Sequence, residues 1–150
     1  IAIEDIGLAD PKAQSIALEA YQIFERLGFP EGELALTNAV IYLSIAPKSN
    51  ASYIAYNESK LFIKDQGHFD TPIHLKNAPT KLMENLDYGK DYRYAHNEMN
   101  AYAAGEKYFP DELDPVEFYR PTDRGLEKKI KEKLDYLKSL DDQHKNKDQG

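Results

Sequence analysis

Cysteine is absent from all 150 residues of the chain. Its absence excludes a disulfide framework, a thiolate metal site and a cysteine nucleophile. Long apolar runs are also missing. The longest stretch, residues 39–46 with Ser44 inside it, is far shorter than the ~20 residues that a membrane-spanning helix needs. No signal or transit peptide is visible, and the chain starts at Ile1 inside an apolar and acidic run. We therefore expect an excised fragment of a cytosolic protein.

The composition is that of a globular protein with an acidic balance. Apolar residues make up 41% and charged residues 30% of the chain, and 26 acidic against 19 basic side chains leave a formal charge of −7. This size predicts a single helical domain, which we assign to residues 1–140. Residues 141–150 contain no apolar side chain and are predicted to be a disordered tail. The acidic balance argues against broad binding to a phosphate backbone, because such binding depends on cationic contacts.

Proline and glycine divide the first half of the chain into three helical segments. Asp10 followed by Pro11 is typical of a helix start, because the carboxylate caps the first turn and proline suits the first helical position. Apolar residues then recur at three- and four-residue steps, which is the spacing of one helical face. The connections are short, so we expect the three helices to pack as roughly antiparallel neighbours. The predicted helices cover 11–27, 30–46 and 50–66.

The segment 68–121 has a different character. It contains five prolines and six of the eleven tyrosines, and no long amphipathic periodicity. Aromatic residues this dense usually pack, so we predict an ordered but irregular chain with a short helix at 80–86 and a turn at 110–113. A short extended piece at 72–75 is the one candidate strand.

The last helix is predicted to begin at Thr122. Leucine and isoleucine recur every three or four residues on a strongly charged helix, and Glu127 with Lys131 has the favourable order for an (i, i+4) ion pair. The predicted fold class is therefore all-α, with a long tyrosine- and proline-rich irregular segment between the third and the last helix.

Motifs for nucleotide, metal and hydrolytic chemistry are incomplete. Lys48-Ser49 is the pair that ends a P-loop, but no glycine precedes it at the required spacing. We interpret Lys48 as a cation near a helix C-terminus and Ser49 as a helix cap. The four histidines form no (i, i+4) pair, and we interpret the loose group of His68, Asp70 and His74 as structural or solvent-exposed. With no G-x-S-x-G sequence either, we predict no catalytic, cofactor-binding or metal-binding residue in this chain.

Basic and aromatic residues alternate in the irregular segment. This mixture is typical of surfaces that bind single-stranded nucleic acid by stacking and charge. Acidic residues nearby cancel most of the positive charge, so the alternative, in which the tyrosines pack the segment onto the helices, stays open. The possible DNA contacts are Lys76, Lys81, Lys90, Arg93, Tyr92 and Tyr94.

Six strings, in this order and spacing, carry a resemblance that covers roughly residues 4–137. They are EDIGLADP at 4–11, IYLSIAPKSN at 41–50, PIHLKNAPTKLM at 72–83, YGKDYRYAH at 88–96, YFPDEL at 108–113 and FYRPTDRGLEKKI at 118–130. Together they resemble the C-terminal region of the replication-associated recombination protein A, or MgsA, family of AAA+ ATPases. That family includes the eukaryotic Werner helicase-interacting protein.

The resemblance implies a helical domain similar to the collar of clamp loaders, associated with tetramer formation, in which Asp10-Pro11 starts the first helix. It also implies an ATPase module N-terminal to this chain that binds ATP and Mg²⁺, because the Walker motifs and sensor arginines are not in this sequence. Action at stalled replication forks and single-strand gaps is implied too, with DNA and single-strand-binding protein as partners near the bacterial nucleoid. No catalytic residue of the family maps onto this chain.

Two functions from different classes are therefore predicted. The first is an assembly module that holds ATPase subunits in a homo-oligomer, because the second predicted helix is apolar on too many sides for a monomer surface. The second is direct binding of single-stranded DNA through residues 76–96, which could coexist with assembly. An independent hydrolase is a third alternative, and it requires a deep pocket with a convergent histidine and carboxylate. The possible subunit-interface residues are Leu36, Val40, Tyr42 and Leu43.

Overall fold

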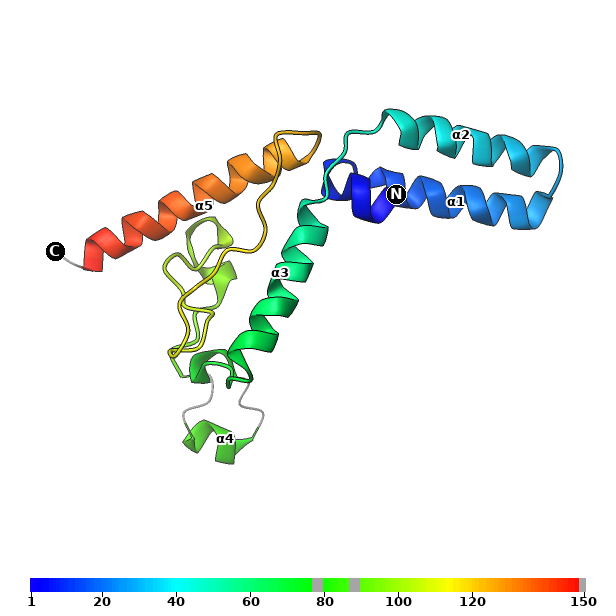
Figure 1. The fold of residues 1–150 in the computed structure, drawn as a ribbon. Coiled ribbons are helices and arrows are strands. Elements are labelled where there is room, and N and C mark those ends of the chain that lie inside the picture. The colour runs from blue at the N-terminus through cyan, green and yellow to red at the C-terminus, as the bar shows by residue number, and fades with distance from the viewer. Residues whose placement is uncertain (77–79, 87–89, 149–150) are drawn as a thin grey trace. The chain divides into compact units, whose positions relative to one another are not determined.

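The computed structural model describes residues 1–76, 80–86 and 90–148. Helices are its regular structure, and no strand occurs within these ranges, which confirms the all-α fold class. In place of the extended piece expected at 72–75 there is a 3-10 turn, Ile73–Leu75. The α-helices are α1 (Lys12–Leu27), α2 (Glu31–Ile45), α3 (Ala51–Gln66), α4 (Lys81–Asn85) and α5 (Glu127–Asp148) (Figure 1).

The described chain forms two compact units, where the sequence predicted one domain over 1–140. Unit 1 contains residues 1–65 and 117–132, and unit 2 contains residues 66–116 together with the chain from Lys133 onward. Helix α5 contributes its first turns to unit 1 and the rest to unit 2. Composition and length do not distinguish one core from two smaller ones, because both bury apolar residues of the same kinds.

Helices α1 and α2 form an antiparallel hairpin that agrees with the predicted ranges to within a residue or two (Figure 1). Gly28 ends α1 with a positive φ of 63° and donates its N–H to the carbonyl of Phe24 at 2.9 Å. The expectation that the third helix packs beside this pair is wrong, since α3, all of whose backbone is described, does not pack along α1 or α2. The reason lies in the connection: the Ser49 N–H donates to the Asp5 carbonyl at 2.7 Å, so the chain is bound to its own first turn before α3 begins.

The core of unit 1 is small. Ile6 is the one large apolar side chain that is fully buried among the residues described, and it packs with Ala13 and Ala46. Tyr42 and Leu43 lie partly buried against this cluster. The other buried apolar residues described in unit 1 are alanines at positions 9, 20, 39 and 51. Alanines let helices approach closely but bury little apolar area, so most large apolar side chains of unit 1 remain on its surface.

Helix α5 begins later and ends later than predicted. It starts at Glu127 because Thr122 serves as a hydrogen-bond donor ahead of the helix, with its N–H 2.9 Å and its hydroxyl 2.7 Å from the Glu127 carboxylate. The expected Glu127–Lys131 pair is wrong, since Glu127 is fully buried and Lys131 pairs with Asp123 at 3.0 Å.

The predicted disordered tail is helical over residues 141–148, and residues 149–150 lie outside the described chain. Asp141 accepts hydrogen bonds from the Tyr102 hydroxyl at 2.9 Å and the Gly105 N–H at 2.8 Å. A Cβ at Gly105 would lie 2.7 Å from a ring nitrogen of His144, so this glycine permits the close approach. These contacts, and the low cost of extending a helix that already exists, account for the longer α5.

Candidate subunit interface and polar pocket

Helix α2 combines exposure with an absence of charge. Its only charged residues are Glu31 and Glu33 in the first turn, and none follows from Leu34 to Ala46. Exposed helix surfaces of soluble proteins normally carry charged side chains, whereas the cores of protein interfaces are depleted of them. The exposed fractions of its large apolar side chains are 65% for Leu34, 63% for Val40, 58% for Ile41 and 80% for Ile45.

The four predicted interface residues fall into two pairs. Leu36 and Val40 are exposed and line an open groove of 440 Å³ beside Phe24 and Phe29, whose rings meet edge to face at 5.5 Å. Tyr42 and Leu43 instead face the core of unit 1.

The Tyr42 hydroxyl donates to Asp10 Oδ2 at 2.7 Å. This hydrogen bond is the main cause of the raised pKa of Tyr42, because ionisation would place two negative charges together.

The interface residues predicted from the sequence did not include Leu34, Ile41 and Ile45. Their spacing along α2 could have included them, since it places them on one helical face.

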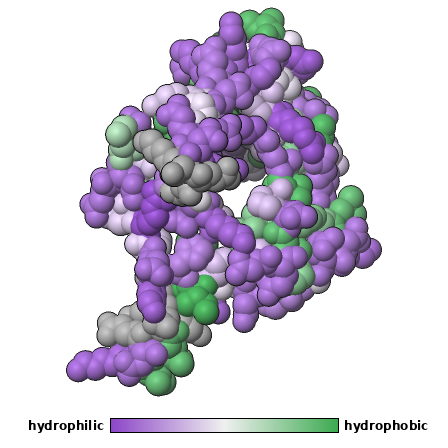
Figure 2. All heavy atoms as spheres, turned by 90° about the vertical axis from the view of Figure 1, so that its left-hand side faces the viewer, coloured by the Kyte–Doolittle hydropathy of each residue, from purple (hydrophilic) through white to green (hydrophobic). Residues whose placement is uncertain are grey.

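A second apolar groove of 740 Å³ lies in unit 1 near the start of the chain. Tyr53 and Tyr56 of α3 line it together with Ile1 and Ile3, and all four side chains are exposed. Glu4 is the one charged residue in its lining. Hydrophobic side chains open to the surface are visible in green on the face drawn in Figure 2.

A buried polar cluster connects three segments of unit 1. The fully buried Glu127 carboxylate accepts hydrogen bonds from the Tyr119 hydroxyl at 2.9 Å and from Thr122. Ser49 also bonds to it. Burial alone would raise the pKa of Glu127, but the hydrogen bonds from Ser49, Thr122 and Tyr119 outweigh burial and lower it. The interpretations of Lys48 and Ser49 are confirmed: Lys48 Nζ donates to the Leu43 and Ala46 carbonyls at 2.7 Å, and Ser49 Oγ accepts the Ala51 N–H at 3.2 Å.

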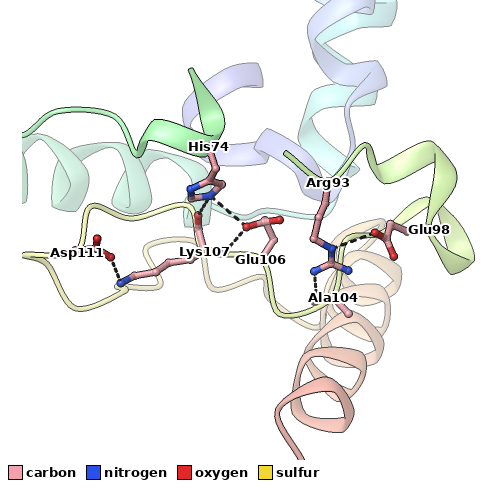
Figure 3. Close-up of polar contacts among 7 residues, drawn as sticks. All are labelled: His74, Arg93, Glu98, Ala104, Glu106, Lys107 and Asp111. Carbon is pink, nitrogen blue, oxygen red and sulfur yellow. Dashed lines mark hydrogen bonds and ion pairs between the residues drawn. The ribbon is translucent and has the colours of Figure 1, made fainter. Parts of the chain in front are cut away.

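The six predicted DNA contacts lie in unit 2 and differ in their exposure and bonding. Arg93 has an internal role, since its Nε donates to Glu98 at 3.0 Å and its Nη1 donates to the Ala104 carbonyl at 2.7 Å (Figure 3). This ion pair raises the pKa of Arg93 and lowers that of Glu98. Lys76 is three-quarters buried and lies 3.9 Å from Asp70. Lys81, Lys90, Tyr92 and Tyr94 are exposed.

A polar pocket of 550 Å³ in unit 2 is the place where a histidine and carboxylates converge. His74 lines it, but its Nε2 lies 2.9 Å from the Lys107 carbonyl and 3.2 Å from Glu106, so it is held within the fold (Figure 3). Lys107 pairs with Asp111 across the same lining. The contacts of the His74 ring with Lys107 and Glu106 support a structural role for His74.

Neither a metal-ligating cluster nor a membrane-spanning helix occurs among the described residues. Within residues 1–76, 80–86 and 90–148, no three His, Asp or Glu side chains are grouped closely enough to hold a metal ion. In the same part of the chain, none of the helices has the length and apolar character needed to cross a membrane.

Comparisons with known proteins agree with one another along almost the whole chain. The family model described as "MgsA AAA+ ATPase C terminal" matches residues 1–138. The Replication-associated recombination protein A of Coxiella burnetii is 54% identical over 145 residues, which is 97% of this chain and 33% of that protein. The protein of the same name from Escherichia coli K12 is 52% identical over 141 residues, or 94% of this chain and 32% of its own length. The ATPase WRNIP1 of Dictyostelium discoideum is 36% identical over 119 residues, or 79% of this chain and 14% of that protein. The chain thus spans about a third of the length of its bacterial relatives.

Proposed function

Because this chain belongs to the MgsA AAA+ ATPase C-terminal family, we propose that it is the assembly domain of an AAA+ ATPase that acts in replication-associated recombination. The domain holds copies of the ATPase together as a homo-oligomer, with a tetramer as the expected form. The observation that carries this proposal is the exposed, charge-free apolar surface of α2. Such a surface is costly in water for a single copy and is stabilised when another copy covers it.

The presence of two grooves supports assembly of more than two copies. Two apolar grooves in unit 1, one beside Val40 and one beside Tyr53, are lined by different residues. A chain with two separate interfaces can build a closed oligomer larger than a dimer.

Under this proposal, ATP and Mg²⁺ bind to a part of the longer protein that corresponds to the two thirds of the relatives that this chain does not match. DNA and single-strand-binding protein are partners of that longer protein. This chain supplies no catalytic group and stays comparatively fixed while the ATPase modules move.

Sedimentation velocity of the purified chain at 5 to about 100 μM tests the proposal, because a two-interface assembly associates within this range when each contact has micromolar affinity. The expected result is a species of at least two copies whose share rises with concentration. A chain that stays monomeric throughout contradicts the proposal.

Direct contact with single-stranded DNA is a second candidate function. It is favoured by two half-exposed rings, Tyr92 and Tyr94, that lie in the same unit as the exposed Lys81 and Lys90. Arg93 is not needed for this contact, since its guanidinium binds Glu98 and Ala104.

Fluorescence anisotropy of a labelled oligonucleotide at low salt tests DNA contact. The double change Lys81→Glu with Lys90→Glu should abolish binding, because it reverses two of the cationic contacts. The matched control is Lys12→Glu in unit 1, which should leave binding unchanged. Binding that is absent from the starting chain, or equal in both variants, removes this candidate.

A further inference from the structure

Five residues of α2 form a line of exposed side chains along one side of the helix, here called the outward stripe. Their positions follow the three- and four-residue steps of a single helical face. Apolar residues lie on both sides of two uncharged polar residues near the centre of the line. The outward stripe consists of Leu34, Thr37, Asn38, Ile41 and Ile45, and every one of these side chains is exposed.

We infer that the outward stripe pairs antiparallel with the same stripe of a second copy, about a twofold axis that passes between Thr37 and Asn38. This inference deepens the proposed assembly function and rests on it. The occupant of the stripe is therefore another copy of this chain, and the contact is isologous, with the same surface on both sides.

The absence of charge favours a second copy. A partner of a different kind is usually selected by complementary charge, and the outward stripe has no charged residue with which to select one. A neutral surface can meet itself without like-charge repulsion. The spacing of four of its five residues is also self-complementary, because rotation about the proposed axis brings Leu34 opposite Ile41 and Thr37 opposite Asn38 of the other copy.

The charges at the end of α2 favour the antiparallel direction. Glu31 and Glu33 lie together in the first turn. A parallel pair would bring the four carboxylates of two copies together, whereas an antiparallel pair about this axis separates the two acidic ends by about 16 Å along the helix. Antiparallel helices also align their dipoles favourably.

Asn38 gives the pair its register. In the inferred arrangement Asn38 lies beside the axis, where its amide can hydrogen-bond to the same residue of the other copy or to Thr37. A polar residue within an apolar helix contact specifies register in this way, because a shifted pairing buries the amide without a partner. A shift by three or four residues in either direction would also place Leu34 or Ile41 opposite Thr37 or Asn38.

Single cysteines test the arrangement, because the chain contains none of its own. Counterparts of residue 38 lie next to each other at the axis, while counterparts of residue 34 are separated by about 10 Å and those of residue 45 by about 22 Å along the helix. Disulfides require Cα atoms within about 7 Å. Under mild oxidation Asn38→Cys should therefore cross-link to itself, whereas Leu34→Cys and Ile45→Cys alone should not.

A mixture of Leu34→Cys with Ile41→Cys should give a disulfide between the two different variants. If Asn38→Cys lowers the helical circular dichroism signal, the variant Thr37→Cys is used in its place. Cross-linking of Ile45→Cys to itself as efficiently as Asn38→Cys would show parallel pairing and overturn the inference. An oligomer that forms without any of the expected cross-links overturns the inference but leaves the proposed function intact, while a monomer overturns both.

Discussion

The carboxylate of Glu127 is fully buried and accepts hydrogen bonds from Tyr119 and Thr122. These bonds lower its pKa, so the ionised form is the one that the folded chain stabilises. Because the folded pKa is depressed, this stabilisation is present above the ordinary glutamate pKa of about 4.3 and is lost as the pH falls through the lower folded value.

We predict that Glu127→Gln lowers the free energy of unfolding by about 2 kcal/mol at pH 7, the scale of hydrogen bonds to a charged group. The variant should also lose less stability than the parent chain between about pH 5 and pH 3, because it lacks the titrating group. Urea unfolding followed by circular dichroism measures both quantities. Glu132→Gln, an exposed change on the same helix, is the matched control. A loss below about 0.5 kcal/mol for Glu127→Gln would contradict the role of the buried cluster.

The roles of residues at helix ends were predictable from the residues next to them in the sequence. Lys48 and Ser49 lie next to the helix ends that they serve, so proline positions and helix spacing were sufficient to interpret them. The role of Glu127 depends on Ser49, which lies 78 positions away and approaches only after folding. A surface ion pair with Lys131 was the reasonable prediction for a glutamate in a charged helix, and tertiary contact replaced it.

At the scale of elements, the positions of proline and glycine predicted the ends of α1, α2 and α3 to within two residues, because helix ends depend on nearby residues. The direction of α3 was not predictable, since it follows from a backbone hydrogen bond between Ser49 and Asp5. The six strings that resemble one family were a stronger guide to identity than any periodicity, and the family match over residues 1–138 confirms them.

The C-terminal part of α5 offers a test at the same scale. Asp141→Ala removes the acceptor of the Tyr102 hydroxyl and the Gly105 N–H, so the Gly105 amide should exchange with solvent at least about tenfold faster. Burial, followed by the bond to Asp141, raises the pKa of Tyr102 to about 12, and this pKa should fall in the variant. Hydrogen exchange and ultraviolet titration measure the two effects.

The neighbouring change Asp142→Ala, at an exposed position of the same helix, is the control for Asp141→Ala. If both variants exchange at the parent rate, residues 141–148 do not hold the 102–105 segment.

Val40 and Leu43 distinguish surface from core within α2. Val40→Asp places a charge on an exposed groove, so we expect the helical signal to remain and self-association to weaken at least about tenfold. Leu43→Asp places a charge against the Ile6 cluster, so we expect loss of helical signal. Circular dichroism and sedimentation equilibrium measure the two properties.

Met99→Asp, an exposed apolar position in unit 2, is the control and should alter neither property. If Val40→Asp associates as strongly as Met99→Asp, the groove beside α2 is not an interface.

For the whole molecule, the two candidate functions, self-association and DNA binding, use different kinds of exposed surface. An interface made by the charge-free part of α2 gains its stability from apolar burial, which salt does not screen. Contact with a phosphate backbone depends on released counterions and weakens steeply with salt. The two functions therefore predict different responses to added salt: self-association should change little, and DNA binding should weaken.

We predict that the dissociation constant for self-association changes by less than about threefold between 50 and 500 mM NaCl, since the screened charges lie outside the apolar contact. Any binding of a single-stranded oligonucleotide should fall by about tenfold or more over the same range. Sedimentation equilibrium and fluorescence anisotropy measure the two constants on the same preparation, with Val40→Asp as the control for association. Self-association that weakens tenfold in high salt would mean that charged groups form the interface. The interface would then be centred on the charged surface of α5 or of unit 2, and not on α2.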